Sequence, residues 1–256
     1  MSVWVDRWRE FIQKTSYIRH LKERNISNDQ FWREYDVYDE ILGLMDYPGK
    51  VLERISFLIH PGSTVLDIGA GTGAFAIPLS RTAGKVIALD PSEHQLQVLT
   101  RKANGINNII TICDTWPDAE ITERIDYTLA AYSLFHEDIL AFLSRMIAIS
   151  HSGVFIVFRA DPPDPLNDFA YGPKPHLDYR CLQSILREMD HDFDIELFPR
   201  DYRLPIKYVL KQYRYSERAP DEIVEYLRST GRLDEEMKVR FQSTDALLYT
   251  LREAES

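Results

Sequence analysis

The chain has 256 residues, 45% of them hydrophobic, and carries a formal net charge of −10 at pH 7 with an isoelectric point near 5.2. A chain of this length can bury roughly three-quarters of its unfolded surface, which is enough for one substantial domain with additions. The acidic balance disfavours a broad surface for nucleic acid, because such a surface needs a basic footprint. We therefore expect a small-molecule partner rather than a nucleic acid.

No apolar run approaches the roughly 18 residues that a membrane-spanning helix needs. The first residues also lack the charged start and apolar block of a signal peptide. Two cysteines, Cys113 and Cys181, indicate no disulfide framework and fit a reducing compartment, with Cys113 expected inside a strand and buried. We expect a soluble, cytoplasmic protein without membrane contact. No paired Cys or His at ligand spacing indicates a metal site.

Helical periodicity dominates residues 1–62, which we interpret as N-terminal packing and lid helices. Residues 4–23 predict an amphipathic helix whose apolar side packs against the body or against a partner subunit, so a homodimer through these helices is one alternative. A second helix is expected to begin at a cap formed by Asn28 and Asp29 and to end before the break at residues 47–49.

The most informative stretch is residues 64–73, Thr-Val-Leu-Asp-Ile-Gly-Ala-Gly-Thr-Gly. Its apolar first half predicts a buried strand. Gly69, Gly71 and Gly73 then allow a sharp turn at which a ligand can approach the backbone without Cβ atoms in the way. The next residues predict a helix, whose free N–H groups and positive dipole end point at the ligand. The pattern indicates a nucleotide-type pocket.

Two classes of ligand fit this pattern. Gly69-x-Gly71-x-x-Ala74 satisfies the dinucleotide fingerprint, and Asp90 lies where that fingerprint has a ribose-binding acid, so an NAD(P)-dependent oxidoreductase is an alternative. Asp67 weighs against it, because a carboxylate two residues before the first glycine would repel a pyrophosphate. A ligand with an ammonium and a sulfonium group, and no phosphate, would tolerate or use that charge.

Asp67-x-Gly69-x-Gly71-x-Gly73 resembles motif I of the class I S-adenosylmethionine-dependent methyltransferases, in particular small-molecule enzymes of the methyltransferase type 11/12 kind. Four later segments resemble the following strands of that family and the loops after them: residues 86–90, 109–114, 126–136 and 153–158. The resemblance covers roughly residues 30–160. It implies S-adenosyl-L-methionine as the cofactor and S-adenosyl-L-homocysteine as the product.

The resemblance and the alternation of strands with helices imply an α/β fold. This fold is a doubly wound, Rossmann-like, seven-stranded and mostly parallel sheet with an antiparallel last strand and an N-terminal helical lid. Helices are expected at 92–103, 136–149 and 178–189, a Pro-rich loop around Tyr171 and His176, and the last two strands at 193–198 and 246–251. Residues 63–256 are expected to form the methyltransferase domain, with an insertion over the substrate pocket at about 200–240.

The resemblance also implies roles for individual residues. The expected cofactor-binding residues are Asp67, Gly69, Ala70, Gly71, Gly73, Asp90, Pro91, Asp114, Thr115 and Tyr132. Asp67 is expected near the methionine ammonium, Asp90 at both ribose hydroxyls, and Asp114 near the adenine. The candidate catalytic residues are His136, in the loop at the transferable methyl, and Tyr35, on the lid. His136 could instead cap the helix that it opens, and Tyr35 could be a packing residue.

Lys207, Lys211, Arg214 and Arg218 recur at intervals of 4, 3 and 4 residues, so on a helix they share one face. Such a face is either solvated or recognises an acidic substrate or RNA, so an RNA or protein methyltransferase that uses residues 200–218 is an alternative. A non-catalytic S-adenosylmethionine-binding protein is another, because no essential base can be named. We predict in-line methyl transfer to a small-molecule acceptor.

Overall fold

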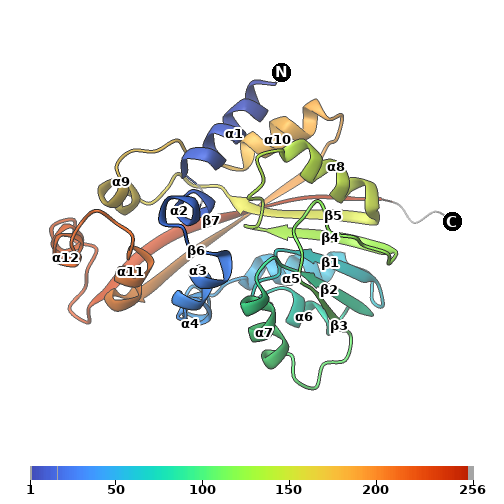
Figure 1. The fold of residues 1–256 in the computed structure, drawn as a ribbon, viewed down its shortest axis with the longest axis horizontal. Coiled ribbons are helices and arrows are strands. Elements are labelled where there is room, and N and C mark those ends of the chain that lie inside the picture. Colours follow the sequence, from blue (N-terminus) through green and yellow to red (C-terminus); the bar gives the residue numbers. More distant parts are fainter. Residues whose placement is uncertain (1, 16, 253–256) are drawn as a thin grey trace.

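A seven-stranded sheet organises residues 2–15 and 17–252, which the computed structural model describes (Figure 1). In sheet order the strands are β3 (Ile109–Ile112), β2 (Lys85–Leu89), β1 (Thr64–Ile68), β4 (Ile125–Ala131), β5 (Ser150–Arg159), β7 (Lys238–Leu251) and β6 (Asp194–Pro205). The first five run parallel to one another, and β7 runs antiparallel to both of its neighbours. The Rossmann-like sheet with an antiparallel last strand is therefore confirmed.

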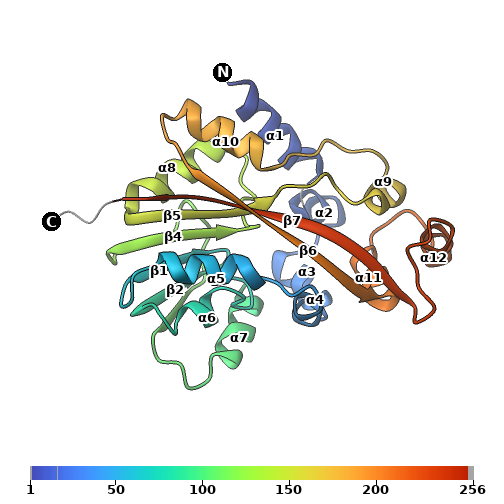
Figure 2. The ribbon, with the colours of Figure 1, turned by 180° about the vertical axis from the view of Figure 1, so that it is seen from behind.

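Helices cover both faces of the sheet (Figures 1 and 2). They are α1 (Val3–Thr15), α2 (Tyr17–Arg24), α3 (Asn28–Glu34), α4 (Tyr38–Leu44), α5 (Gly49–Leu58), α6 (Ala76–Leu79), α7 (Glu93–Lys102), α8 (Ile139–Ile149), α9 (Pro165–Tyr171), α10 (Tyr179–Glu188), α11 (Ile206–Gln212) and α12 (Pro220–Ser229). Within the described part of the chain, no helix combines the length and the apolar character that crossing a membrane requires.

The strands are apolar on both sides because both sides are covered. Successive residues of a strand point to opposite faces. Leu66 and Ile68 of β1 accordingly pack with α1, α8 and α10, whereas Val65 packs with α5, α6 and α7. The helices on the two faces leave the carboxyl ends of β1, β2 and β4 free. These ends form one edge of the sheet, which α3 and α4 approach from the side (Figure 1).

The helix expected over residues 4–23 corresponds to two helices, α1 and α2. α1 ends at Thr15 and α2 begins at Tyr17, and residue 16 lies outside the described residues. Trp8 of α1 is fully buried, and its indole Nε1 donates to the backbone oxygen of His136 at 2.9 Å. The apolar side of α1 therefore packs into the core of its own chain, and a homodimer through this helix would have to use other surfaces.

The second expected helix is also divided, into α3 and α4, and its predicted cap was wrong. Ser27 rather than Asn28 or Asp29 caps α3, because its hydroxyl accepts a hydrogen bond from the first turn. The Asp29 carboxylate instead accepts from the Ser92 hydroxyl at 2.6 Å and from the His94 N–H at 3.3 Å. These bonds tie α3 to the start of α7.

The interval expected as an insertion at about 200–240 consists of the end of β6, the helices α11 and α12, and the start of β7. β6 has 12 residues and β7 has 14, and they pair from Asp194–Tyr249 to Pro205–Lys238. Beyond the rest of the sheet these strands form a two-stranded β6–β7 arm, residues 199–243, which carries α11 and α12 (Figures 1 and 2). An apolar cluster fixes the arm to α4 through Ile41 and Leu204.

Three other local expectations were wrong. α8 begins at Ile139 and not at His136, because Asp138 caps it by accepting from the Ala141 N–H at 3.0 Å. His136 therefore lies in the preceding loop and does not cap the helix. The Pro-rich loop contains the short helix α9. Cys113 is exposed, because β3 is a four-residue edge strand that ends before it.

Candidate functional site

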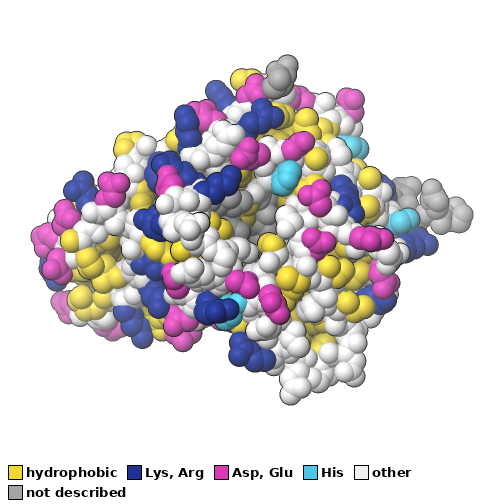
Figure 3. Space-filling view, viewed as in Figure 1, with side chains coloured by type: hydrophobic (Ala, Val, Ile, Leu, Met, Phe, Trp, Pro, Cys, Tyr) yellow, Lys and Arg dark blue, Asp and Glu magenta, His cyan; other side chains and the backbone are white. Residues whose placement is uncertain are grey.

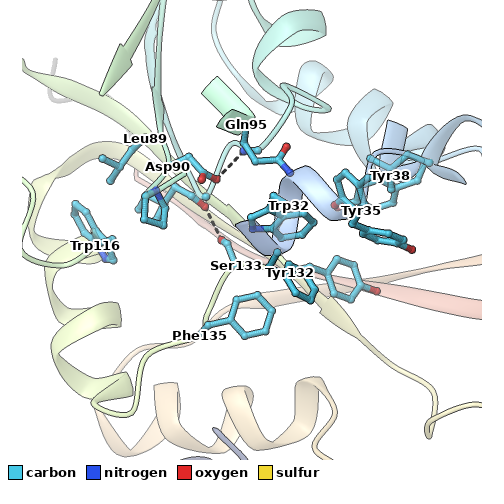
Figure 4. A pocket seen from close by; sticks show the side chains of 18 of the residues that line it. Trp32, Tyr35, Tyr38, Leu89, Asp90, Gln95, Trp116, Tyr132, Ser133 and Phe135 are labelled. Carbon is cyan, nitrogen blue, oxygen red and sulfur yellow. Dashed lines mark hydrogen bonds between the residues drawn. The ribbon is translucent and has the colours of Figure 1, made fainter. Parts of the chain in front are cut away.

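A cavity of about 550 Å³ lies where the carboxyl ends of β1, β2 and β4 meet α3, α4 and the β6–β7 arm. Asp90, after β2, lies on one side of it and Tyr35 and Tyr38 on another, with Trp32 and Tyr132 between them (Figure 4). In open α/β sheets, ligands bind in the crevice outside the carboxyl ends of the strands, where the strand order reverses, as it does here between β1 and β4. The volume is within the range of roughly 300–1,000 Å³ that is typical of small-molecule sites.

The glycine loop after β1 forms one wall of the cavity. Gly69 and Gly71 have φ values of 75° and 54°, which L side chains rarely adopt. A Cβ at Gly69 would lie 2.3 Å from the Cβ of Ser133, so the loop after β4 can approach only because Gly69 has no side chain. At Gly71 the nearest atom to such a Cβ would be Gln95 Oε1, at 3.9 Å. The backbone at Gly71 is therefore open to a ligand.

Asp90 is held at the edge of the cavity by two backbone N–H groups. Its Oδ2 accepts from Gly71 at 2.9 Å, and its Oδ1 accepts from Ser92 at 2.8 Å. Burial raises the pKa of this carboxyl, the two hydrogen bonds lower it, and the neighbouring Asp29 raises it further. Each carboxylate oxygen has capacity for another donor. Two acceptors are thus fixed side by side.

Asp67, Ala70 and Gly73 lie beneath the cavity and are not part of its wall. Asp67 is 2% exposed, and its Oδ2 meets no hydrogen-bond donor among the described residues. Burial and, to a smaller extent, the neighbouring Asp90 together raise the pKa of Asp67 to about 7, although the hydrogen bond from the Ala76 N–H lowers it. Buried polar atoms are usually partnered, so a bound water or a cationic ligand group would complete this site.

Pro91, Asp114, Thr115 and Trp116 line the cavity after β2 and β3. The Thr115 N–H donates to Asp114 Oδ1 at 2.7 Å. Trp116 was not predicted as a site residue. It is 5% exposed, and its indole Nε1 donates to the Phe142 oxygen at 3.1 Å, which fixes the ring in the wall. Its one sequence signal is its position, two residues after the acid that follows β3.

Tyr132 opens the loop after β4 in a left-handed conformation, with φ of 53°. Its phenol donates to Asp245 Oδ1 at 2.6 Å, and Arg200 Nη2 donates to the same oxygen at 2.9 Å. Burial raises the pKa of Tyr132 well above its ordinary value, and Asp245 raises it further. Because its hydroxyl is bonded to Asp245, Tyr132 anchors the loop to the sheet and presents its ring to the cavity.

His136 lies half-buried in the wall of the cavity, in the same loop. Its Nδ1 lies 3.0 Å from the Asp138 carbonyl oxygen and 3.2 Å from the Asp138 backbone nitrogen. The tautomer decides the chemistry of the other ring nitrogen. If Nδ1 donates to the carbonyl, Nε2 can accept a proton; if Nδ1 accepts from the N–H, Nε2 is a donor.

Aromatic side chains line the cavity away from Asp90. Trp32 and Tyr38 meet edge to face with ring centres 5.1 Å apart, and Tyr35 lies 5.8 Å from Tyr38 (Figure 4). Tyr47 and Tyr132 meet at 6.0 Å. Burial raises the pKa of Tyr35 to about 12 and those of the other three phenols as well. These hydroxyls are therefore uncharged at physiological pH.

Four of the six basic side chains of residues 200–218 are paired with acids of the same chain. Arg200 pairs with Asp245, Arg203 with Asp234, Lys211 with Asp36 and Arg218 with Glu222. α11 ends at Gln212, so the four residues expected on one helix face do not share one. Arg214 lies against the rings of Phe31, Tyr35 and Tyr215. On the face shown in Figure 3, positive and negative side chains are interspersed.

Among residues 2–15 and 17–252, no group of three His, Cys, Asp or Glu side chains is placed to hold a metal ion.

Comparison with known proteins addresses the family. Residues 65–153 match a family model described as a methyltransferase domain. A ubiquinone biosynthesis O-methyltransferase from Bradyrhizobium diazoefficiens is 34% identical over 99 residues, which are 38% of this chain and 39% of that protein. The chain spans about two-fifths of the length of the curated relatives that it matches.

Two solved structures share the fold. A protein from Bacillus subtilis aligns with a TM-score of 0.60 at 15% identity and covers 80% of this chain and 99% of its own. A SAM-dependent methyltransferase from Thiobacillus denitrificans, in complex with S-adenosyl-L-homocysteine, aligns with a TM-score of 0.57 at 12% identity and covers 87% and 98%. Residues 65–153 therefore match a methyltransferase domain, within a Rossmann-like fold that the chain shares with these two structures.

Proposed function

We propose that the protein transfers a methyl group from S-adenosyl-L-methionine to a small-molecule acceptor. The observation that carries this proposal is the Asp90 carboxylate, which Gly71 and Ser92 hold with two acceptor oxygens side by side at the edge of the cavity. The two adjacent hydroxyls of a ribose are matching donors. The names of the relatives, an O-methyltransferase and a SAM-dependent methyltransferase, support the same chemistry.

The donor end of the cavity, which we define as Gly69, Gly71, Asp90, Asp114 and Trp116, fits this cofactor. Asp90 would hold the ribose. Asp114, with neighbouring Pro91 and Thr115, and the Trp116 ring would enclose the adenine.

The acid beneath the glycine loop fits the same cofactor. Asp67 has an oxygen without a hydrogen-bond donor among the described residues, and the nearby Asp90 raises its pKa, so a ligand with sulfonium and ammonium charges would offset the negative charge of both acids. When bound, S-adenosyl-L-methionine supplies a methyl group that its sulfonium has already activated.

The chain's own task is then to position the acceptor and to exclude water. The ring of Tyr132, fixed through Asp245, lies between the donor end and the aromatic part of the cavity. His136 would take a proton from the acceptor in the tautomer that donates to the Asp138 carbonyl. Tyr35 would act as a hydrogen-bonding group rather than as a base, since its raised pKa keeps it protonated.

The alternatives are less well supported by the structure. Dinucleotide-binding sheets have six parallel strands in the order 3-2-1-4-5-6, whereas here the antiparallel β7 lies between β5 and β6. Recognition of RNA through residues 200–218 would require free cations, and four of those side chains are paired with acids. A non-catalytic S-adenosylmethionine-binding protein differs from our proposal in turnover alone.

Thermal unfolding with S-adenosyl-L-methionine, S-adenosyl-L-homocysteine and NADH tests the proposal. The first two should raise Tm, because a ligand at 100 times its Kd stabilises the folded state by about 2.7 kcal/mol. Stabilisation by NADH alone would overturn the assignment. Transfer of a radiolabelled methyl group to small molecules then separates an enzyme from a protein that only binds the cofactor.

A further inference from the structure

We propose that the acceptor end of the cavity takes an uncharged aromatic molecule, an inference that rests on the proposed methyl transfer. The acceptor end is the part lined by α3, α4 and the β6–β7 arm, and includes Trp32, Tyr38, Arg200, Gln212 and Ser243. Its shape, its charge and its unsatisfied polar atoms point to the same class of acceptor.

The walls of the acceptor end are aromatic rings with fixed orientations. Trp32 meets Tyr38 at an interplanar angle of 64° and a centre separation of 5.1 Å, and Tyr47 meets Tyr132 at 66° and 6.0 Å. Aromatic rings prefer such edge-to-face and offset contacts over the same area of aliphatic surface. Rings from α3, from α4, from the loop before α5 and from the loop after β4 thus surround a space that suits a further ring.

Arg200, a charged residue in the wall of this end, is already neutralised within the chain. Arg200 Nε lies 2.8 Å from Asp245 Oδ2, and its Nη1 donates to the Met45 oxygen at 3.1 Å. The guanidinium also lies 5.1 Å from the Tyr47 ring centre and 5.8 Å from that of Tyr202. An anionic acceptor would have to compete with the fully buried Asp245 for this cation, and a cationic acceptor would be repelled by it.

The polar groups that remain are neutral and suit hydrogen bonding. Ser243 Oγ is buried near the Tyr202 phenol, whose pKa it lowers, and makes no hydrogen bond of ordinary geometry with a described residue. Ser243 of β7 is paired directly with Arg200 of β6, so the two side chains lie on the same face of the arm. Gln212 shares a hydrogen bond with Tyr35, whose raised pKa keeps that phenol uncharged. A polar substituent on the aromatic acceptor would satisfy groups that are otherwise costly to bury.

Calorimetric titration of the protein loaded with S-adenosyl-L-homocysteine tests this inference with four probes of similar size. They are 4-ethylphenol, its anionic analogue 4-hydroxyphenylacetate, its cationic analogue tyramine, and the non-aromatic 4-ethylcyclohexanol. We expect 4-ethylphenol to bind at least about tenfold more tightly than each of the others. Tighter or equal binding of any other probe overturns the inference, as does no binding of 4-ethylphenol up to its solubility.

The loading step separates this inference from the proposed function. If S-adenosyl-L-homocysteine itself does not bind, the proposed function fails. If it binds and 4-ethylphenol is not preferred, the function stands and the inference about the acceptor fails.

A charge placed in the acceptor end tests its location. In Gln212→Glu the new carboxylate can accept a hydrogen bond from the uncharged Tyr35 phenol, and it adds a negative charge to the wall. We expect the affinity for tyramine relative to 4-hydroxyphenylacetate to rise at least about tenfold. Gln183→Glu, on α10 outside the cavity, is the matched control and should leave this ratio unchanged. An unchanged ratio in Gln212→Glu would overturn the placement.

Discussion

Replacing the buried Asp67 by asparagine should stabilise the ligand-free protein at neutral and higher pH. Burial raises the pKa of Asp67 in the folded state to about 7, from an ordinary value of 3.8. Because the folded-state pKa is the higher one, the folded state binds the proton more tightly, and stability falls as the pH rises between these two values. At about 1.4 kcal/mol per pKa unit, this gap sets an upper bound of about 4 kcal/mol on the stability lost above pH 7.

Urea unfolding between about pH 4 and pH 8 measures this effect in the wild type, in Asp67→Asn and in the control Asp118→Asn. The free energy of unfolding of Asp67→Asn should exceed that of the wild type increasingly as the pH rises. Asp118 is exposed, so its variant should stay within about 0.5 kcal/mol of the wild type throughout. Parallel pH profiles for Asp67→Asn and the wild type would refute the reasoning. Despite its greater stability, Asp67→Asn should bind S-adenosyl-L-homocysteine more weakly, because it lacks the charge expected to attract the ammonium.

Two further substitutions probe the glycine loop and its acid. Asp90→Asn replaces one acceptor oxygen by an amide donor that faces a backbone N–H, so calorimetry should show affinity for S-adenosyl-L-homocysteine reduced roughly 10- to 100-fold. An unchanged Kd would contradict the ribose role. Gly69→Ala should lower the free energy of unfolding more than Gly105→Ala does. Both variants place a side chain at a left-handed φ, which costs roughly 1–2 kcal/mol, but only at Gly69 would the new Cβ also collide with Ser133. Equal losses in urea unfolding would argue against that collision.

The donor end could be predicted because its signals are local. β1, β2 and β4 are buried on both faces and appear as apolar runs, and Asp90 directly follows one of them. The depth of Asp67 was harder to predict. The alternation of side chains places Asp67 on the same side of β1 as Val65, toward α6. How far the glycine loop separates Asp67 from the cavity depends on how that turn folds, which the sequence does not show.

The β6–β7 arm could not be predicted in the same way. Residues 199–205 contain two prolines and three charged side chains, a composition that favours a loop. β6 is an edge strand, however, and an edge strand tolerates Pro199 because one of its sides needs no hydrogen-bond donors. The pair of Arg200 with Asp245 depends on the register of the two strands, which no local pattern in the sequence fixes.

The two ends of the cavity come from different parts of the chain, and this limits what similarity can say about the substrate. The donor end lies within residues 65–153, which match the methyltransferase model. Trp32, Arg200 and Gln212 of the acceptor end lie outside that range, on α3 and on the arm. Relatives that match only this domain can therefore inform the donor end of the cavity, and not its acceptor end. Specificity follows from the residues that touch the substrate, so the acceptor must be inferred from the rings and hydrogen-bonding groups of this chain.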